Sequence, residues 1–183
     1  KSVPMVFQSY SSYEWMTVIE NVALPLIIKG VPKKEAEEKA MEMVRFVGLE
    51  PHATKYAKSS LLSGGQLQRV SIARCLASGS KVFFLDEATG ALDIKTKREV
   101  QDLILDISHN KGIETTIINV THNVEEALYI SDKIIVLAPN PCSIVEIMDI
   151  DYGNTARGRW VLETEKYHGY EKKLNNLLDE VCK

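Results

Sequence analysis

Three short apolar runs, beginning at residue 82, restrict the fold more than any other feature. They occupy residues 82–85, 116–120 and 133–137. Stretches of helical character separate them, at residues 95–108 and 124–130. Short buried strands that alternate with helices are typical of a parallel sheet covered on both faces. The sequence therefore predicts an α/β fold in which helices flank a mostly parallel sheet.

The first part of the chain follows a helical period instead. Thr17 and Glu20 have capping-box spacing, so a helix is expected to start there and to be kinked or ended by Pro25. A second helix is expected between Pro32, which suits a first helical position, and Gly48, which suits a helix end. Apolar residues recur at helical spacing between these two positions. These features predict a small helical subdomain.

Composition excludes several classes of protein. The 183 residues carry a formal net charge of -3 with acidic and basic residues mixed, so the basic stripe of a nucleic-acid-binding protein is missing. Cys75, Cys142 and Cys182 are widely separated and form no CxxC pair, which argues against a disulfide framework or a zinc site. No apolar run approaches the roughly 18 residues that span a bilayer. At a membrane, the protein would act as a peripheral subunit.

The segment Ser63-Gly64-Gly65-Gln66 has the chemistry of a phosphate contact. Ser63 and Gln66 have capping-box spacing, which predicts that Ser63 caps a helix. The start of a helix presents unpaired N–H groups and the positive end of the helix dipole, and two glycines let a phosphate approach the backbone closely. Taken alone, the same four residues also fit a helix cap without a ligand.

Two adjacent acids, Asp86 and Glu87, follow the apolar run at residues 82–85. Ligands bind at the carboxyl ends of strands in doubly wound sheets. Adjacent carboxylates at such a place repel each other unless a cation or a reaction requires them. Taken alone, the pair also fits a solvent-exposed loop that caps the next helix.

These motifs, in this order, resemble those of ATP-binding-cassette (ABC) ATPases. Residues 62–69 (Leu-Ser-Gly-Gly-Gln-Leu-Gln-Arg) resemble the signature motif of that family, and residues 82–87 resemble its Walker B motif with the glutamate that follows it. The resemblance covers about residues 4–138 well and the remainder only faintly. It implies a P-loop NTPase-like fold with an inserted helical subdomain.

The resemblance implies an ATP site that is shared between two subunits. In that family the signature of one subunit caps the γ-phosphate of the ATP that the opposite subunit holds. The corresponding residues here are Ser63, Gly64, Gly65 and Gln66. Asp86 would help to hold Mg²⁺, largely through water, and Glu87 would polarise the attacking water as general base.

Three further positions match family motifs. Asp93, at the end of residues 90–93, matches the D-loop, which crosses the dimer interface. His122 resembles the switch histidine that contacts the γ-phosphate, and it is followed by Asn123 in place of the usual Asp, an equally good helix cap. Gln8 resembles the start of the Q-loop, so it would ligate Mg²⁺ through its amide oxygen and relay the nucleotide state to a membrane subunit.

The resemblance divides the chain into four expected segments. Residues 1–8 end the N-terminal part of the ATPase core, and residues 9–78 form the helical subdomain with the signature. Residues 79–150 form the core with Walker B, the D-loop and the switch histidine. Residues 151–183 form a C-terminal tail that contains an amphipathic helix.

The phosphate-binding loop G-x-x-x-x-G-K-[ST] is absent from the sequence. In the family this loop lies upstream of the Q-loop. The simplest account is a chain truncated before the Q-loop, so the Walker A part is missing. The 183-residue chain alone is therefore expected not to hydrolyse ATP.

Residues 15–23 are similar to the start of the helical subdomain in bacterial importer ATPases, above all those of the nitrate, sulfonate and taurine group. The resemblance implies an ATPase subunit on the cytoplasmic face of the cell membrane that binds ATP and Mg²⁺. Its implied partners are a second copy, transmembrane permease subunits and a solute-binding protein, with no nucleic acid. Closure of the dimer on ATP would power solute import.

Other members of the family stay open as alternatives. Ala88 stands where many importers have Pro and is common in exporters, so an exporter ATPase is one of them. A soluble non-transport ABC ATPase is another, although the long coiled coils and zinc-binding cysteines of that group are not found in this sequence. A regulatory relative that binds nucleotide without hydrolysing it is a third, and intact Glu87 and His122 argue against it.

Overall fold

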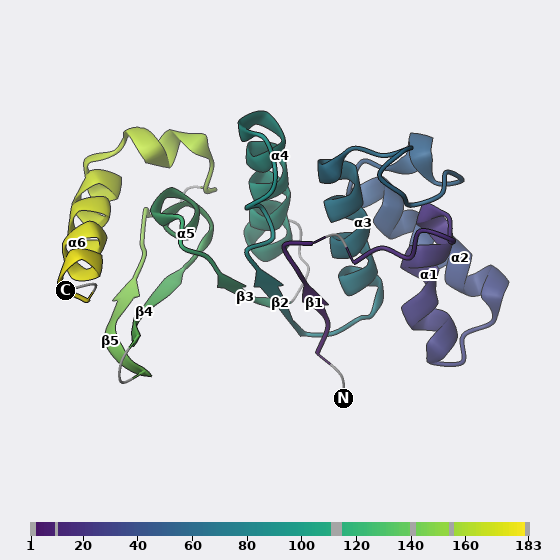
Figure 1. Cartoon of the computed structure of the whole chain (residues 1–183), viewed down its shortest axis with the longest axis horizontal. Helices are drawn as coiled ribbons and strands as arrows, with labels where there is room; N and C mark the ends of the chain where they lie inside the picture. The colour runs from purple at the N-terminus through teal and green to yellow at the C-terminus, as the bar shows by residue number, and fades with distance from the viewer. Residues whose placement is uncertain (1–2, 10, 111–114, 140–141, 154–155, 182–183) are drawn as a thin grey trace. The chain divides into compact units, whose positions relative to one another are not determined.

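The computed structural model describes residues 3–9, 11–110, 115–139, 142–153 and 156–181 (Figure 1). The chain forms two compact units. One consists of Lys1–Leu103 and Ile113–Val120, and the other of Ile104–Gly112 and Thr121–Lys183. Within the described ranges, no helix is both long enough and apolar enough to cross a membrane.

The first unit contains a parallel sheet of three strands. They are β1 (Met5–Val6), β2 (Val82–Asp86) and β3 (Thr116–Val120), in the spatial order β1-β2-β3. Val6 is paired with Leu85, and Asp86 is paired with Val120. The predicted α/β fold with a parallel sheet is confirmed here. Because the strands are parallel, their carboxyl ends lie at one edge of the sheet.

Three helices of the same unit form the helical subdomain. They are α1 (Val18–Ile28), α2 (Lys33–Phe46) and α3 (Gly64–Ala77), and a short 3-10 turn, η1 (Glu50–His52), follows α2. In Figure 1, α3 lies between the sheet and the other two helices, and it contacts β1 as well as α1 and α2. Helix α3 thus links the helical subdomain to strand β1 of the sheet.

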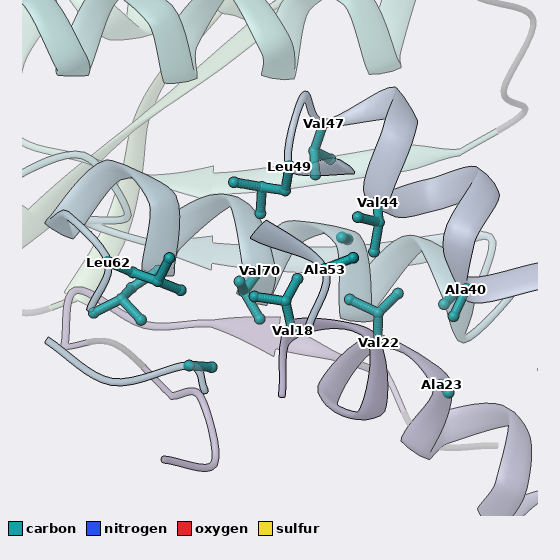
Figure 2. Packing of buried hydrophobic residues seen from close by; sticks show 14 of the residues in the cluster. Val18, Val22, Ala23, Ala40, Val44, Val47, Leu49, Ala53, Leu62 and Val70 are labelled. Atoms are coloured by element: carbon teal, nitrogen blue, oxygen red, sulfur yellow. The ribbon is translucent and has the colours of Figure 1, made fainter. Parts of the chain in front are cut away.

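The helical subdomain has its own apolar core. Buried side chains from all three helices pack together in it, as Figure 2 shows for Val22 of α1, Val44 of α2 and Val70 of α3. Pro25 does not end α1, because the helix continues past it to Ile28. Gly48 follows α2 with a φ of +72°, a left-handed conformation that suits glycine at a helix end.

The helix α4 (Ile94–Leu105) starts in the first unit and continues into a π-helical turn, η2 (Asp106–Asn110). The second unit further contains α5 (Val124–Ile130), β4 (Lys133–Pro139), β5 (Cys142–Asp149), a 3-10 turn η3 (Arg159–Glu163) and α6 (Glu165–Val181). Its core joins the helices to the strands through Leu128, Val136, Met148, Ile150, Tyr167 and Leu174.

The third apolar run differs from the prediction. β4 pairs antiparallel with β5 in a separate two-stranded sheet, and does not join the parallel one. Only two residues separate β4 from β5, and so short a connection joins antiparallel neighbours, whereas a parallel pair needs a crossover of a dozen residues or more.

Candidate functional site

The carboxyl-end edge of the parallel sheet brings three of the predicted site residues to one place. Gln8 follows the end of β1 by two residues, while Asp86 ends β2 and Glu87 comes directly after it. The register aligns these ends, because Val6 is paired with Leu85 in the neighbouring strand. Such an edge is where ligands bind in α/β sheets.

Glu87 has a left-handed backbone. Its φ is +46°, and it is the non-glycine residue with positive φ among those described. A side chain with a Cβ pays about 1–2 kcal/mol for this conformation. Two hydrogen bonds hold the residue there: its N–H donates to the Val120 carbonyl at 2.9 Å, and its carbonyl accepts from the Gly90 N–H at 2.9 Å. Strain of this kind concentrates at functional sites.

The side chain of Gln8 lies beside the turn that Glu87 begins. A Cβ added to Gly90 would be 3.3 Å from Nε2 of Gln8 and 3.3 Å from the carbonyl oxygen of Glu87. A side chain at position 90 would therefore press on both groups. Gln8 itself is exposed and Asp86 is partly buried, so a ligand can reach this edge from solvent.

Gln68 holds the backbone just before Gln8. It lies on α3, is fully buried, and its Nε2 donates to the Phe7 carbonyl at 3.2 Å. Its other polar atom, Oε1, is buried without a hydrogen-bond partner among the described residues. Burying an amide oxygen without a hydrogen-bond partner destabilises the folded state, so the presence of Gln68 here points to a role in positioning the Phe7 backbone.

Arg74 holds the other end of the same segment, two turns further along α3. Its guanidinium donates to the carbonyl and hydroxyl of Ser11 at 2.7 and 2.8 Å, and it lies over the Tyr13 ring, 5.0 Å from the ring centroid. Asn21 of α1, fully buried, donates to the Tyr13 carbonyl at 3.0 Å and accepts from the Tyr13 N–H at 2.8 Å. The segment that begins with Gln8 is thus fixed to the helical subdomain.

The signature residues form the predicted capping box. Ser63 Oγ accepts from the Gln66 N–H at 3.3 Å, and Gln66 Oε1 accepts from the Ser63 N–H at 2.9 Å. Gln66 Nε2 also lies 2.9 Å from His52 Nε2. In an α-helix the first N–H groups have no carbonyl partner within the helix, and here Gly64 and Gly65 supply the first two. Ser63 is exposed, so the predicted phosphate contact lies at a surface.

Asp93 caps α4. One carboxylate oxygen accepts from the N–H groups of Lys95 and Thr96, each at 3.1 Å. The hydrogen bond with the Thr96 side chain, followed by the backbone ones, holds the pKa of Asp93 below its ordinary value of 3.8. The carboxylate therefore stays charged at neutral pH, exposed at the start of the helix.

His122 belongs to the second compact unit. It is exposed, two residues after the end of β3 along the chain. Asn123 caps α5 as expected, because its Oδ1 accepts from the Glu126 N–H at 2.7 Å. The local structure around the candidate switch histidine is therefore well defined without the usual Asp.

The donor chemistry at the sheet edge fits Mg²⁺ that arrives with phosphates. The candidate ligands are the amide oxygen of Gln8 and the carboxylate of Asp86. Mg²⁺ is commonly held by one or two protein oxygens and completed by phosphate oxygens and water. Over the described ranges there is no group of three or more His, Cys, Asp or Glu side chains able to hold a metal ion.

Sequence reasoning missed Gln68, Arg74 and Thr96, which position the site residues. A signal was present for the first two. Gln68, Ser71 and Arg74 recur every third residue on a helix with many apolar positions, and Ser71 Oγ lies 3.4 Å from Ser11 Oγ. Three polar side chains on one face of a helix predict that this face contacts a polar segment. The spacing does not identify that segment.

Comparison with known proteins shows which proteins this chain is similar to. The family described as ABC transporter matches residues 1–90. The chain is 41% identical, over 98% of its length, to an uncharacterized ABC transporter ATP-binding protein of Methanocaldococcus jannaschii, of which it covers 64%. It is 36% identical, over 97% of its length, to the taurine import ATP-binding protein TauB of Roseobacter denitrificans, of which it covers 65%.

Solved structures agree with the sequence relatives. The dimeric structure of a bacterial ABC transporter cassette is similar with a TM-score of 0.67 and 32% identity, over 82% of this chain and 64% of that one. The chain thus spans somewhat less than two thirds of the length of these proteins. In both its motifs and its fold, the chain is similar to ABC transporter ATP-binding proteins and cassettes.

Proposed function

We propose that this chain works within the ATP-hydrolysing subunit of an ABC transporter that powers solute import. The observation that carries the proposal is the position of Glu87, strained and doubly hydrogen-bonded at the carboxyl end of β2, with Gln8 beside the turn it begins. A carboxylate and an amide oxygen at that edge suit nucleotide chemistry. We call a protein that joins this chain to an upstream phosphate-binding loop a complete cassette.

Glu87 acts as the general base in this proposal. Its carboxylate takes a proton from the water that attacks the γ-phosphate, a role that typically accelerates a reaction by about 10²–10⁴-fold. The hydrogen bonds to Val120 and Gly90 fix the backbone from which the carboxylate extends. Little has to reorganise at the moment of reaction, which is how positioned groups lower a barrier.

Gln8 and Asp86 would hold Mg²⁺, which, when bound with ATP, neutralises charge on the phosphates. Gln68 sets the position of Gln8 through the Phe7 carbonyl. His122 would contact the γ-phosphate, and the cap that Asn123 makes on α5 steadies the backbone next to it. Each of these roles follows the family motif at the same position of this sequence.

The signature would serve the nucleotide of a second copy. Ser63, Gly64, Gly65 and Gln66 start α3, where backbone N–H groups and the helix dipole favour phosphate. The similar cassette was solved as a dimer, which supports this arrangement. Asp93, exposed at the start of α4, would lie at the interface between the two copies.

Importer function and location complete the proposal. Among the relatives, one is named for taurine import and another for spermidine/putrescine import, and the resemblance of residues 15–23 favours the former, so a taurine-like sulfonate is the proposed solute class. The protein would lie on the cytoplasmic face of the membrane as a peripheral subunit, and bind transmembrane permease subunits that receive solute from a solute-binding protein. The segments 9–78, 79–150 and 151–183 would then be the helical subdomain, the ATPase core and the tail.

Steady-state hydrolysis tests the proposed chemistry. A complete cassette should hydrolyse ATP with Mg²⁺, and Glu87→Gln should reduce the rate by at least about 100-fold while ATP still drives dimer formation. The 183-residue chain alone should not hydrolyse ATP, because it has no phosphate-binding loop. Robust turnover by that chain, abolished by Glu87→Gln, would contradict the last point, and a fully active Glu87→Gln cassette would remove Glu87 from its role.

A further inference from the structure

Gly65 and Thr96 meet between the first turns of α3 and α4. A Cβ built on Gly65 would lie 2.0 Å from Cγ2 of Thr96 and 3.5 Å from its Cβ. Carbon atoms do not approach to 2.0 Å without a bond, so the Thr96 methyl group occupies the space that a side chain at position 65 would need. Gly65 is buried at this contact. The second glycine of the signature is therefore required by packing inside this chain, whether or not a nucleotide is present.

The methyl group of Thr96 cannot turn aside freely. Threonine is branched at Cβ, which restricts its χ1 angle to few rotamers. The Asp93 carboxylate engages the same residue twice, since it accepts from the Thr96 N–H at 3.1 Å and is hydrogen-bonded to the Thr96 hydroxyl. With the hydroxyl held by Asp93, the methyl group stays against Gly65.

A second contact joins the same two helices one turn further along. Arg69, one turn after Gly65, donates to the carboxylate of Glu99 at 2.8 Å, one turn after Thr96. Leu103, a further turn along α4, packs against the helical core. Together, the contact between Gly65 and Thr96 and the ion pair between Arg69 and Glu99 join the first two turns of α3 to those of α4.

We propose that Thr96 is a positioning residue that ties the D-loop to the signature of the same chain. The Asp93 carboxylate orients the hydroxyl, and the methyl group sets where the first turn of α3 lies. A displacement of Asp93 when a second copy approaches would then move Gly65, and with it the N–H groups that reach the partner's nucleotide. The coupling rests on the proposed function, while the packing on which it depends does not.

Matched glycine substitutions test the packing of Gly65 against Thr96. The measured quantity is the unfolding temperature of a complete cassette without nucleotide. Gly65→Ala should lower it by roughly 5 °C, because overpacking strains the contact. Thr96→Ser removes the methyl group, so Gly65→Ala with Thr96→Ser should recover most of that loss. Gly169 of α6 is the control: nothing lies within 4 Å of a Cβ added there, so Gly169→Ala should raise the unfolding temperature by about 2 °C. An equal loss from Gly65→Ala with or without Thr96→Ser would overturn the packing.

Thr96→Val tests the coupling, because it keeps a methyl group and loses the hydroxyl that Asp93 holds. In a Glu87→Gln background, it should raise the ATP concentration for half-maximal dimer formation by about tenfold, the worth of one hydrogen bond to a charged group. A merely structural Thr96 would leave this concentration unchanged, and that result would overturn the coupling. A wild-type cassette that never dimerises on ATP would overturn the proposed function and the coupling with it, whereas the unfolding temperatures would still decide the packing.

Discussion

The backbone N–H of Glu87 donates to the carbonyl of Val120 at 2.9 Å, which carries the sheet pairing one step beyond the end of β2. Glu87 thereby stays attached to the neighbouring strand in spite of its left-handed φ of +46°. The neighbouring pair, Asp86 and Val120, shares the last register position of the two strands. The candidate base is therefore part of the sheet edge, and hydrogen bonds to β3 and to the turn that follows hold its conformation.

The strain at Glu87 predicts a difference between stability and activity. Glycine adopts the left-handed region without the cost that a Cβ brings, so Glu87→Gly should be more stable than Glu87→Ala by about 1 kcal/mol in free energy of unfolding. Both variants should lose hydrolysis by about 100-fold or more, since neither has a base. Chemical denaturation of the two complete cassettes measures the first effect. A less stable Glu87→Gly would show that no strain resides at this residue.

Two capping boxes among the described residues allow a matched comparison. Ser63 with Gln66 starts α3, and Thr17 with Glu20 starts α1 with the same geometry. Ser63→Ala and Thr17→Ala should each destabilise the fold by about 1 kcal/mol, the usual worth of an N-cap. Only Ser63→Ala should also raise the ATP concentration needed for dimer formation in a Glu87→Gln background. Equal effects of both variants on dimer formation would mean that the signature acts through stability alone.

Gln68 and Arg74, the two residues of α3 that hold the segment beginning with Gln8, predict separate effects on that segment. Gln68→Met removes the donor to the Phe7 carbonyl and, with it, an unpaired buried oxygen, so stability should change by less than about 1 kcal/mol. Amide hydrogen exchange should nevertheless accelerate near Gln8, and the Mg²⁺ concentration for half-maximal hydrolysis should rise. Arg74→Met should accelerate exchange at Ser11 and Tyr13 instead. Identical exchange patterns in the two variants would show that the segment is not anchored at two points.

The cap at Asp93 predicts a dependence of stability on pH. Its folded-state pKa is held below the ordinary 3.8, chiefly by the hydrogen bond with the Thr96 side chain. The stability it contributes is therefore fully present above the unfolded-state pKa and is lost as the pH falls through the folded-state value. The difference in unfolding free energy between wild type and Asp93→Asn should be constant well above pH 3.8 and shrink as the pH falls through that value and below it. A difference that grows on acidification would contradict the cap.

Local features of this fold could be predicted from the sequence, and contacts between distant segments could not. The caps at Thr17, Ser63 and Asn123 depend on residues three apart, and the structure contains all three. The partner of β4 was predicted wrongly, because an apolar run records burial and not the direction of its neighbour. The roles given to Asp86, Glu87 and His122 stay predictions that rest on family motifs.

The positioning contacts show the same limit at the site. Gln68 meets Phe7 across 61 positions of sequence, and Thr96 meets Gly65 only because two helices pack together. Neither pair has a spacing that a local pattern can express. The polar spacing along α3 indicated that Gln68 and Arg74 needed partners, and only the fold identifies them.

The central claim, that the signature of this chain serves the nucleotide of a second copy, is tested most directly by mixing inactive subunits. Gly64→Asp places a negative charge where phosphate would bind. The N-terminus of α3 tolerates an acidic side chain because the helix dipole is positive there. Glu87→Gln removes the base. A cassette dimer with one variant in each subunit retains one intact site, because Glu87 of one copy faces the unmodified signature of the other. Both changes in a single subunit, paired with wild type, leave no intact site.

ATP hydrolysis by the two isolated mixed dimers is the deciding measurement. The account predicts that the dimer with one variant in each subunit retains up to half of the wild-type rate, and that the dimer with both changes in one subunit is inactive. The reverse result, activity only when both changes lie in the same subunit, would contradict it, because it would mean that each chain uses its own signature.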